Sequence, residues 1–343
     1  MILAYIVLGA LWLALIVYAA LGGADFGGGI WDFLAVGPLA ERQRSLVGQA
    51  LGPVWETNHV WLIFLIVGLF VAFPTAFSVL ATALFVPFTL ALIGIVLRGS
   101  AFTFRAYAAK TAVARKVWGR VFSSASTITP FLFGTCAAAV ASGQIRVVGG
   151  SVQTLIWTGW TTPFALTIGA MALALCAALA AIYLTLEARS MNDSELVEAF
   201  RLRAIIAGAI AAALGALGIL LSPFEAPLLW SGMLAHAIPI VIVTMLVGLG
   251  AATALFVRRY LLARVLIVIE TGCFFAAWGA SQLPYLIPPH VTVENSASPA
   301  ITMEEFLICV VAGMIFLLPS LWFLFHVFKG RNPVPLHEEK QGS

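Results

Sequence analysis

Six ionisable side chains lie within or directly beside apolar stretches long enough to cross a membrane: Asp25, Glu56, His59, His236, Glu270 and His326. Burying a charged group in a bilayer is costly, so each of them is a candidate functional residue. Carboxylic acids and imidazoles are also the side chains that most often transfer protons in proteins. Their types therefore point to the movement of protons through a membrane.

Three of these residues are expected near the cytoplasmic face. Glu56 and His59 are three residues apart and share one face of a helix. A rise of about 1.5 Å per residue places Glu56 about 3 Å into its span and Glu270 about 14 Å into another. Asp25 follows the first span. Asp25, Glu56 and His59, with Glu270 farther in, are predicted to form a polar file rising from the cytoplasm.

Structural roles compete with this interpretation. Glu56 stands at the start of a helix, where a carboxylate complements the helix dipole. Asp25 could cap a turn among the neighbouring glycines, or pair with Arg42 or Arg44. Glu270 could be neutral and hydrogen-bonded within its span.

Histidines and cysteines raise the question of a metal or haem. His59 and His326 are both expected near the inner face, so a haem held by two histidines is conceivable. Histidines with ordinary structural partners are the alternative. The four cysteines stand singly in apolar runs without CxxC spacing, which is typical of packing residues. The sequence therefore predicts no metal ligand and no cofactor ligand in this chain.

The elements that carry these residues are expected to be membrane-spanning helices. The composition is 62% hydrophobic and only 10% charged, which excludes an ordinary soluble enzyme. A net charge of +3 without a concentrated basic face argues against nucleic-acid binding. The apolar runs are continuous rather than alternating, which favours helices over strands. Nine runs qualify, at 3–21, 54–74, 76–98, 121–142, 161–186, 203–222, 232–256, 261–282 and 306–328.

Charge asymmetry predicts the orientation of these spans. With the N-terminus outside, all lysines and arginines except Arg146 fall at or near the cytoplasmic face. The predicted cytoplasmic segments are 22–53, 99–120, 187–202, 257–260 and a tail over 329–343. The fold class is thus an all-α polytopic membrane protein, a single integral domain with a periplasmic N-terminus and a cytoplasmic C-terminus.

Three connecting segments have distinctive compositions. The basic and aromatic stretch 99–120 suits either a helix on anionic headgroups or a solvated loop. The outer stretch 283–305 is rich in proline and expected to be irregular, and 329–343 is expected to be a disordered tail. The glycines of GGADFGGGI lack a phosphate-loop ending and are expected to allow close backbone approach where the first helix ends.

Three motifs occur in a characteristic order along the first 105 residues: GADFGGGI after the first span, GPVWETNHVWL opening the second, and LRGSAFTFR closing the third. Together they resemble subunit II of the cytochrome bd-type quinol oxidases, in particular the cyanide-insensitive branch. Beyond these motifs, the resemblance rests on span count, orientation and length.

The resemblance implies two four-helix bundles plus one peripheral helix, paired with a larger haem-bearing subunit I in the bacterial inner membrane. It implies that haem b and haem d-type groups belong to subunit I, and that subunit II stabilises the complex, contributes to a cytoplasmic proton path and can hold a structural quinone. A small single-span subunit is a further expected partner. The residues matching the family motifs are Asp25, Trp55, Glu56, Asn58, Trp61, Arg98 and Arg105.

This sequence departs from the family pattern at three places. Where the family often has Asp-Gly-Asn followed by Glu or Gln, this chain has Glu56, Thr57, Asn58 and His59. Thr103 stands where an acid often lies between the two arginines. The acid that often precedes the D-F-G residue is absent from the segment 21–23. If the proton path exists, His59 or bound water is expected to replace these carboxylates.

The function predicted from these residues is subunit II of a terminal oxidase that oxidises quinol and reduces oxygen to water. Two other classes of function remain open at this point. A proton-coupled secondary transporter would use Glu270 at the membrane midplane. A stand-alone di-haem cytochrome would use His59 and His326.

Overall fold

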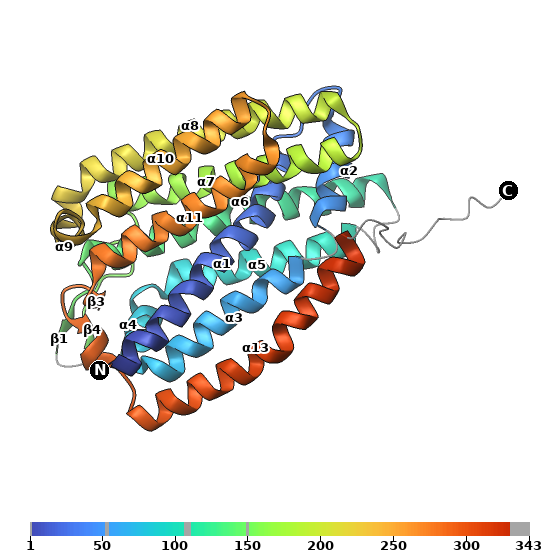
Figure 1. Cartoon of the computed structure of the whole chain (residues 1–343). Helices are drawn as coiled ribbons and strands as arrows, with labels where there is room; N and C mark the ends of the chain where they lie inside the picture. The colour runs from blue at the N-terminus through green and yellow to red at the C-terminus, as the bar shows by residue number, and fades with distance from the viewer. Residues whose placement is uncertain (1, 52–54, 106–110, 149–150, 330–343) are drawn as a thin grey trace.

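The computed structural model is an elongated assembly of helices that run along one common direction (Figure 1). It describes residues 2–51, 55–105, 111–148 and 151–329, and the side chains of Leu51, Trp55 and residues 325–329 lie outside this description. Within the described residues, eight helices are long and apolar enough to cross a membrane, or nine when a bent pair is counted as one span. The chain is therefore an all-α polytopic membrane protein.

Among the described residues, nine helices each overlap one of the nine predicted spans. They are α1 (Ile2–Phe33), α3 (Trp55–Ala72), α5 (Phe85–Thr103), α6 (Ala112–Ser142), α7 (Pro163–Ser190), α8 (Ser194–Glu225), α10 (Ile238–Phe256), α11 (Tyr260–Gln282) and α13 (Ala300–Lys329). The short elements are α2 (Ala40–Leu51), α4 (Pro74–Ala83), α9 (Pro227–Gly232), the π-turn η2 (Met233–Ala237), α12 (Val293–Ser296) and two hairpins, β1 (Val147–Val148) with β2 (Ser151–Val152) and β3 (Tyr285–Ile287) with β4 (Val291–Thr292).

The first helix is longer than predicted. The expectation that the helix ends at the glycine segment is wrong, because α1 contains the predicted span 3–21 and continues through the glycines to Phe33. The glycines are needed along the helix rather than after it. A Cβ at Gly27 would lie 1.9 Å from the carbonyl oxygen of Cys176, and one at Gly29 would lie 2.2 Å from Cβ of Ser126. These glycines let neighbouring helices approach α1 closely, as predicted, and Asp25 lies within the helix rather than after it.

The predicted span 76–98 is also wrong, because the chain breaks within it. The short helix α4 bends 119° away from α3, and the crossing helix α5 begins only at Phe85. Pro74 occupies the first turn of α4 and Pro87 the first turn of α5. Proline is tolerated in the first turn of a helix, where the backbone N–H has no partner within the helix. Pro74 therefore marks the start of α4 at the boundary between two predicted spans, and Pro87 marks the start of α5 inside the second of them.

Several helices extend past the apolar runs into segments predicted as loops. The segment 99–120 contains the end of α5 and the start of α6, and 187–202 contains the end of α7 and the start of α8. The outer segment 283–305 holds the β3–β4 hairpin and α12, so the expectation of irregular structure there is wrong. The tail beyond residue 329 lies outside the described residues.

The helix α1 is at the centre of the packing. It contacts α3, α6, α7 and α11, while α5 packs on α6, α8 on α7, and α10 on α11 (Figure 1). The last helix, α13, lies at the edge of the molecule against α3 and α1. The grouping into two four-helix bundles stays a prediction.

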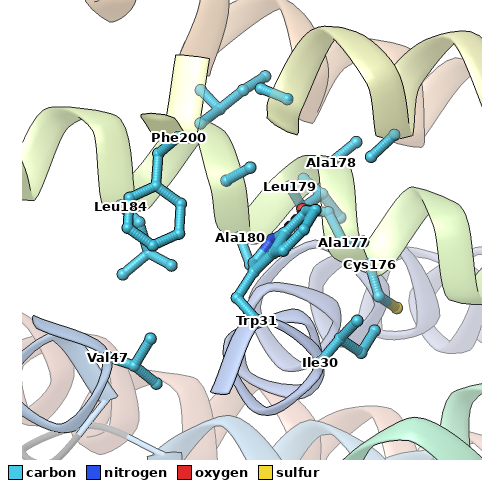
Figure 2. Close-up of a cluster of buried hydrophobic side chains, with 14 of the residues drawn as sticks. Ile30, Trp31, Val47, Cys176, Ala177, Ala178, Leu179, Ala180, Leu184 and Phe200 are labelled. Atoms are coloured by element: carbon cyan, nitrogen blue, oxygen red, sulfur yellow. Dashed lines mark hydrogen bonds between the residues drawn. The ribbon is translucent and has the colours of Figure 1, made fainter. Parts of the chain in front are cut away.

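The indole of Trp31 packs in the hydrophobic core between α1 and α7 (Figure 2). Trp31 of α1 donates a hydrogen bond of 2.8 Å from Nε1 to the carbonyl oxygen of Ala177 on α7. Its ring meets Phe200 of α8 edge-on, at 6.5 Å between centroids. This cluster joins helices that are far apart in sequence, and it holds the half of α1 that carries Asp25.

The helix α2 forms salt bridges with the turn between α7 and α8, at the end of the molecule where α1 ends. Arg42 forms salt bridges with Asp193 and Glu195, the latter at 2.7 Å, in the turn between α7 and α8. Hydrogen bonds from Arg42 hold the pKa of Asp193 below its ordinary value, because they stabilise the charged carboxylate. The short helix thus links the end of α1 to the second half of the chain.

Candidate functional site

Asp25 is buried where α1 meets α3. Its side chain is about 5% exposed, and Nδ2 of Asn58 donates a hydrogen bond of 2.6 Å to Oδ2. Two motifs separated by 33 residues are thereby joined through one contact. Because the glycines before and after Asp25 let α1 lie close to its neighbours, the carboxylate is placed inside the protein rather than on its surface.

Arg98 of α5 supplies a positive charge to the same region. It is 1% exposed, and its Nε donates to Oγ of Ser126 at 3.2 Å. The guanidinium carbon lies 5.0 Å from the ring centroid of Phe26 and 5.5 Å from that of Phe122. The Asp25 carboxylate also interacts electrostatically with this guanidinium. A buried arginine needs such a counter-charge, so the pair is balanced inside the membrane region.

Two aromatic residues and His59 surround this pair. The His59 ring is 6.0 Å from the ring of Tyr18 and 6.1 Å from that of Phe26, measured between centroids. The hydroxyl of Tyr18 is buried, and it has no hydrogen-bond partner among the described residues. Tyr18 was not a predicted site residue, because a tyrosine within an apolar span is not distinctive in sequence. We call Tyr18, Asp25, Asn58, His59 and Arg98 the Asp25 cluster.

The remaining predicted residues divide into those near this cluster and those apart from it. Glu56 is exposed in the first turn of α3, two residues before Asn58. Glu270 lies on α11 against α10, where a Cβ at Gly248 would be 2.5 Å from Oε1 of Glu270. The structure therefore does not join Glu270 to the Asp25 cluster. Trp61 is half-buried on α3, and the side chain of Trp55 lies outside the described residues.

A second carboxylate pairs with the other motif arginine. Asp32 is 5% exposed, forms a salt bridge of 2.9 Å with Arg105, and accepts a hydrogen bond of 2.6 Å from Oγ of Ser123. The sequence analysis missed Asp32 as a site residue. It stands seven residues after Asp25, on the same helix face, which is visible once α1 is known to continue through the glycines. Thr103 instead donates to the carbonyl of Gly99.

The other histidines do not assemble a ligand set. His236 is exposed in the π-turn η2, and the side chain of His326 lies outside the described residues. Among the described residues, no group of three His, Cys, Asp or Glu side chains could hold a metal ion. The Asp25 cluster brings together a buried acid, an imidazole and a phenol, which are side chains able to donate or accept protons.

Comparison with known proteins decides the family. Residues 3–328 match the family described as cytochrome bd terminal oxidase subunit II. This chain belongs to that family. A bd-family subunit II is part of a quinol oxidase complex, an oxidoreductase of bacterial respiratory membranes, whose partner is subunit I. Family membership therefore favours the oxidase subunit over the transporter and the di-haem cytochrome.

Individual relatives agree with this assignment. The chain is 24% identical over 334 residues, 95% of both sequences, to a protein of Bacillus subtilis (strain 168) whose name provisionally assigns it as a cytochrome bd menaquinol oxidase subunit II. It is 32% identical over 130 residues to cytochrome bd ubiquinol oxidase subunit 2 of the same organism, covering 36% of this chain and 37% of that one.

A solved structure has the same fold. A chain of the bd oxidase from Geobacillus thermodenitrificans superposes with a TM-score of 0.77 at 20% identity, covering 97% of this subunit II and all of the other chain. At this identity the likeness concerns the fold alone.

Proposed function

We propose that this subunit II provides part of a cytoplasmic proton path of the oxidase, in which Glu56 receives protons and His59 and Asp25 carry them inward. One observation supports this above all: Asp25 is buried, yet it is hydrogen-bonded to a helix whose first turn exposes Glu56. The proposed path therefore runs from a surface carboxylate to an interior one along the first turn of α3.

The distribution of basic residues supports a cytoplasmic start for this path. The helix α2, the α7–α8 turn and the α10–α11 turn all lie at one end of the molecule, away from the N-terminus (Figure 1). That end carries Arg42, Arg44, Arg201, Arg258 and Arg259, and Glu56 lies there in the first turn of α3. Segments rich in arginine stay on the cytoplasmic side, so this end is proposed to face the cytoplasm.

Each member of the Asp25 cluster has a distinct proposed task. Asn58 holds the Asp25 carboxylate by a hydrogen bond, and Arg98 balances its charge. His59 can accept a proton at one ring nitrogen and release one from the other. Tyr18 offers a buried hydroxyl on the inner side of Asp25, where a proton could next be passed. Glu270 is not part of this proposal, because it lies against α10.

The whole complex is proposed to oxidise quinol and reduce oxygen to water, with haem b and haem d-type groups in subunit I. A structural quinone, bound membrane lipid and a small single-span subunit are the remaining proposed components. The tagged chain is expected to co-purify with the larger subunit, and haem absorbance should disappear when that partner is removed. Haem retained by this chain alone would contradict the assignment of haem to subunit I.

The proton path is tested with the assembled complex in liposomes. We expect Glu56→Gln and Asp25→Asn to lower oxygen consumption and charge movement by about a hundredfold, the low end of what positioned proton-transfer groups contribute. Glu304→Gln, an exposed acid at the other end of the molecule, is the matched control and should behave as wild type. Haem spectra show whether each variant assembles. Wild-type turnover and charge movement in both path variants would refute the proposal.

A further inference from the structure

Two arginine–tyrosine contacts join α7 and α11 near the basic end of the molecule. The guanidinium carbon of Arg264 lies 4.6 Å from the ring centroid of Tyr183, and that of Arg189 lies 5.7 Å from the ring centroid of Tyr260. Each helix thus contributes one arginine and one tyrosine. Because Arg264 is four residues after Tyr260, the two contacts differ in height by about 6 Å along α11. We call these four residues the arginine–tyrosine ladder.

The rings hold both guanidinium groups in place. Tyr260 is 5% exposed and belongs to the main hydrophobic cluster, and Tyr183 packs against the same cluster. Arg189 and Arg264 themselves are exposed. An arginine that lies over an aromatic ring keeps its N–H groups free to bind an anion, because the contact uses the flat face of the guanidinium and the N–H groups point outward in its plane.

The ladder carries positive charge that the described residues do not neutralise. Nearby, Glu198 forms salt bridges with both Arg201 and Arg258. In contrast, no carboxylate in the described part of the chain forms a salt bridge with Arg189 or Arg264. This surface therefore favours an anion supplied from outside the chain.

The surroundings of the ladder suit a lipid rather than a free ion. On α11, Val265 and Ile269 follow Arg264 away from the basic end, share one helix face, and are 54% and 45% exposed. An apolar helix face that ends in arginines matches a phospholipid, whose acyl chains lie below a charged phosphate. Basic pockets between transmembrane helices are known to hold anionic headgroups in this way.

We infer that the arginine–tyrosine ladder is a binding site for the phosphate group of an anionic phospholipid in the cytoplasmic leaflet. Arg189 and Arg264 bind the phosphate oxygens, and Val265 and Ile269 contact the acyl chain. The site is separate from the Asp25 cluster and does not depend on the proposed proton path.

The test is a titration of the detergent-solubilised complex, followed by native mass spectrometry. Phosphatidylglycerol is the probe, and phosphatidylcholine and inorganic phosphate are the comparisons. Two arginines near an anionic lipid contribute roughly a thirtyfold change in affinity. We therefore expect Arg189→Gln combined with Arg264→Gln to weaken phosphatidylglycerol binding by roughly thirtyfold.

A matched control separates this site from general surface charge. Arg115→Gln with Arg120→Gln removes two exposed charges from α6 at the same end, and should leave the affinity almost unchanged. Tyr183→Phe should retain binding because it keeps the ring, while Tyr183→Leu should weaken it. The inference would be overturned if both arginine double variants lost the same phosphatidylglycerol affinity, or if neither lost any. It would also be overturned if phosphatidylcholine, or inorganic phosphate alone, bound as tightly as phosphatidylglycerol.

Discussion

The close contact between α1 and α7 predicts a large effect for a single added methyl group at Gly27. A Cβ there would lie 1.9 Å from the carbonyl oxygen of Cys176 and 2.6 Å from Cβ of Ala180. Real Cβ atoms essentially never approach within 3.0 Å, so α1 and α7 must separate by at least 1.1 Å, which is 3.0 Å less 1.9 Å. The obstacle is backbone, which cannot rotate away as a side chain can.

The energetic cost follows from this overlap. Overpacking a well-packed core costs about 1–3 kcal/mol, and a clash with backbone belongs at the upper end. Replacing glycine by alanine within a helix returns up to about 1 kcal/mol. We therefore expect Gly27→Ala to destabilise the subunit by roughly 2 kcal/mol. Turnover should also fall, because α1 carries Asp25 two residues away.

The matched control lies in the same helix. A Cβ added at Gly9 would meet no heavy atom within 4 Å, so Gly9→Ala should leave stability unchanged or slightly raised. The assay is the melting temperature of the detergent-solubilised complex, together with its oxygen consumption. Equal melting temperatures for Gly27→Ala and Gly9→Ala would refute the reasoning from close helix packing.

Two further predictions concern polar contacts. Asn58→Ala removes the hydrogen bond to the buried Asp25 carboxylate and should cost about 1.5–3 kcal/mol, seen as a lower melting temperature than for Thr57→Ala beside it. Arg42→Gln tests the lowered pKa of Asp193. A carboxyl group whose pKa is lower in the folded state than in the unfolded state stabilises the protein above about pH 4. This stabilisation is lost as the pH falls through the folded-state pKa. The difference in melting temperature between wild type and Arg42→Gln should therefore be largest near about pH 6 and shrink below about pH 4; a difference independent of pH would contradict it.

The number and approximate position of the spans could be predicted because apolar length is a local property of the sequence. The predicted helix bounds were wrong where one residue type, glycine or proline, is compatible with two different backbone structures. Glycines indicated the end of the first helix, yet their small size allows α1 to continue against Cys176 and Ser126. The run 76–98 was interpreted as a single span, although Pro87 marks the start of a second helix within it.

The candidate site was predicted only in part. Asp25, Glu56 and His59 were singled out because ionisable groups are rare in apolar spans, and the structure places Asp25 and His59 in one cluster. Asp32 was missed because the expected end of the first helix placed it in a loop. The position of Glu270 along α11 could be estimated from its spacing, but its direction toward Gly248 could not.

The sequence by itself determined that this is a polytopic helical membrane protein and which motifs resemble subunit II of the bd oxidases, and it predicted that all basic residues except Arg146 fall at one end. Only the tertiary structure decided that Asn58 binds Asp25, that Arg105 pairs with Asp32, and that Arg264 stacks on Tyr183. The physical reason lies in the helices themselves. The sequence of a helix that is apolar on all sides does not indicate which face packs against which neighbouring helix. Helix pairing is therefore set by the close packing of small residues and by the few buried polar groups that need hydrogen-bond partners.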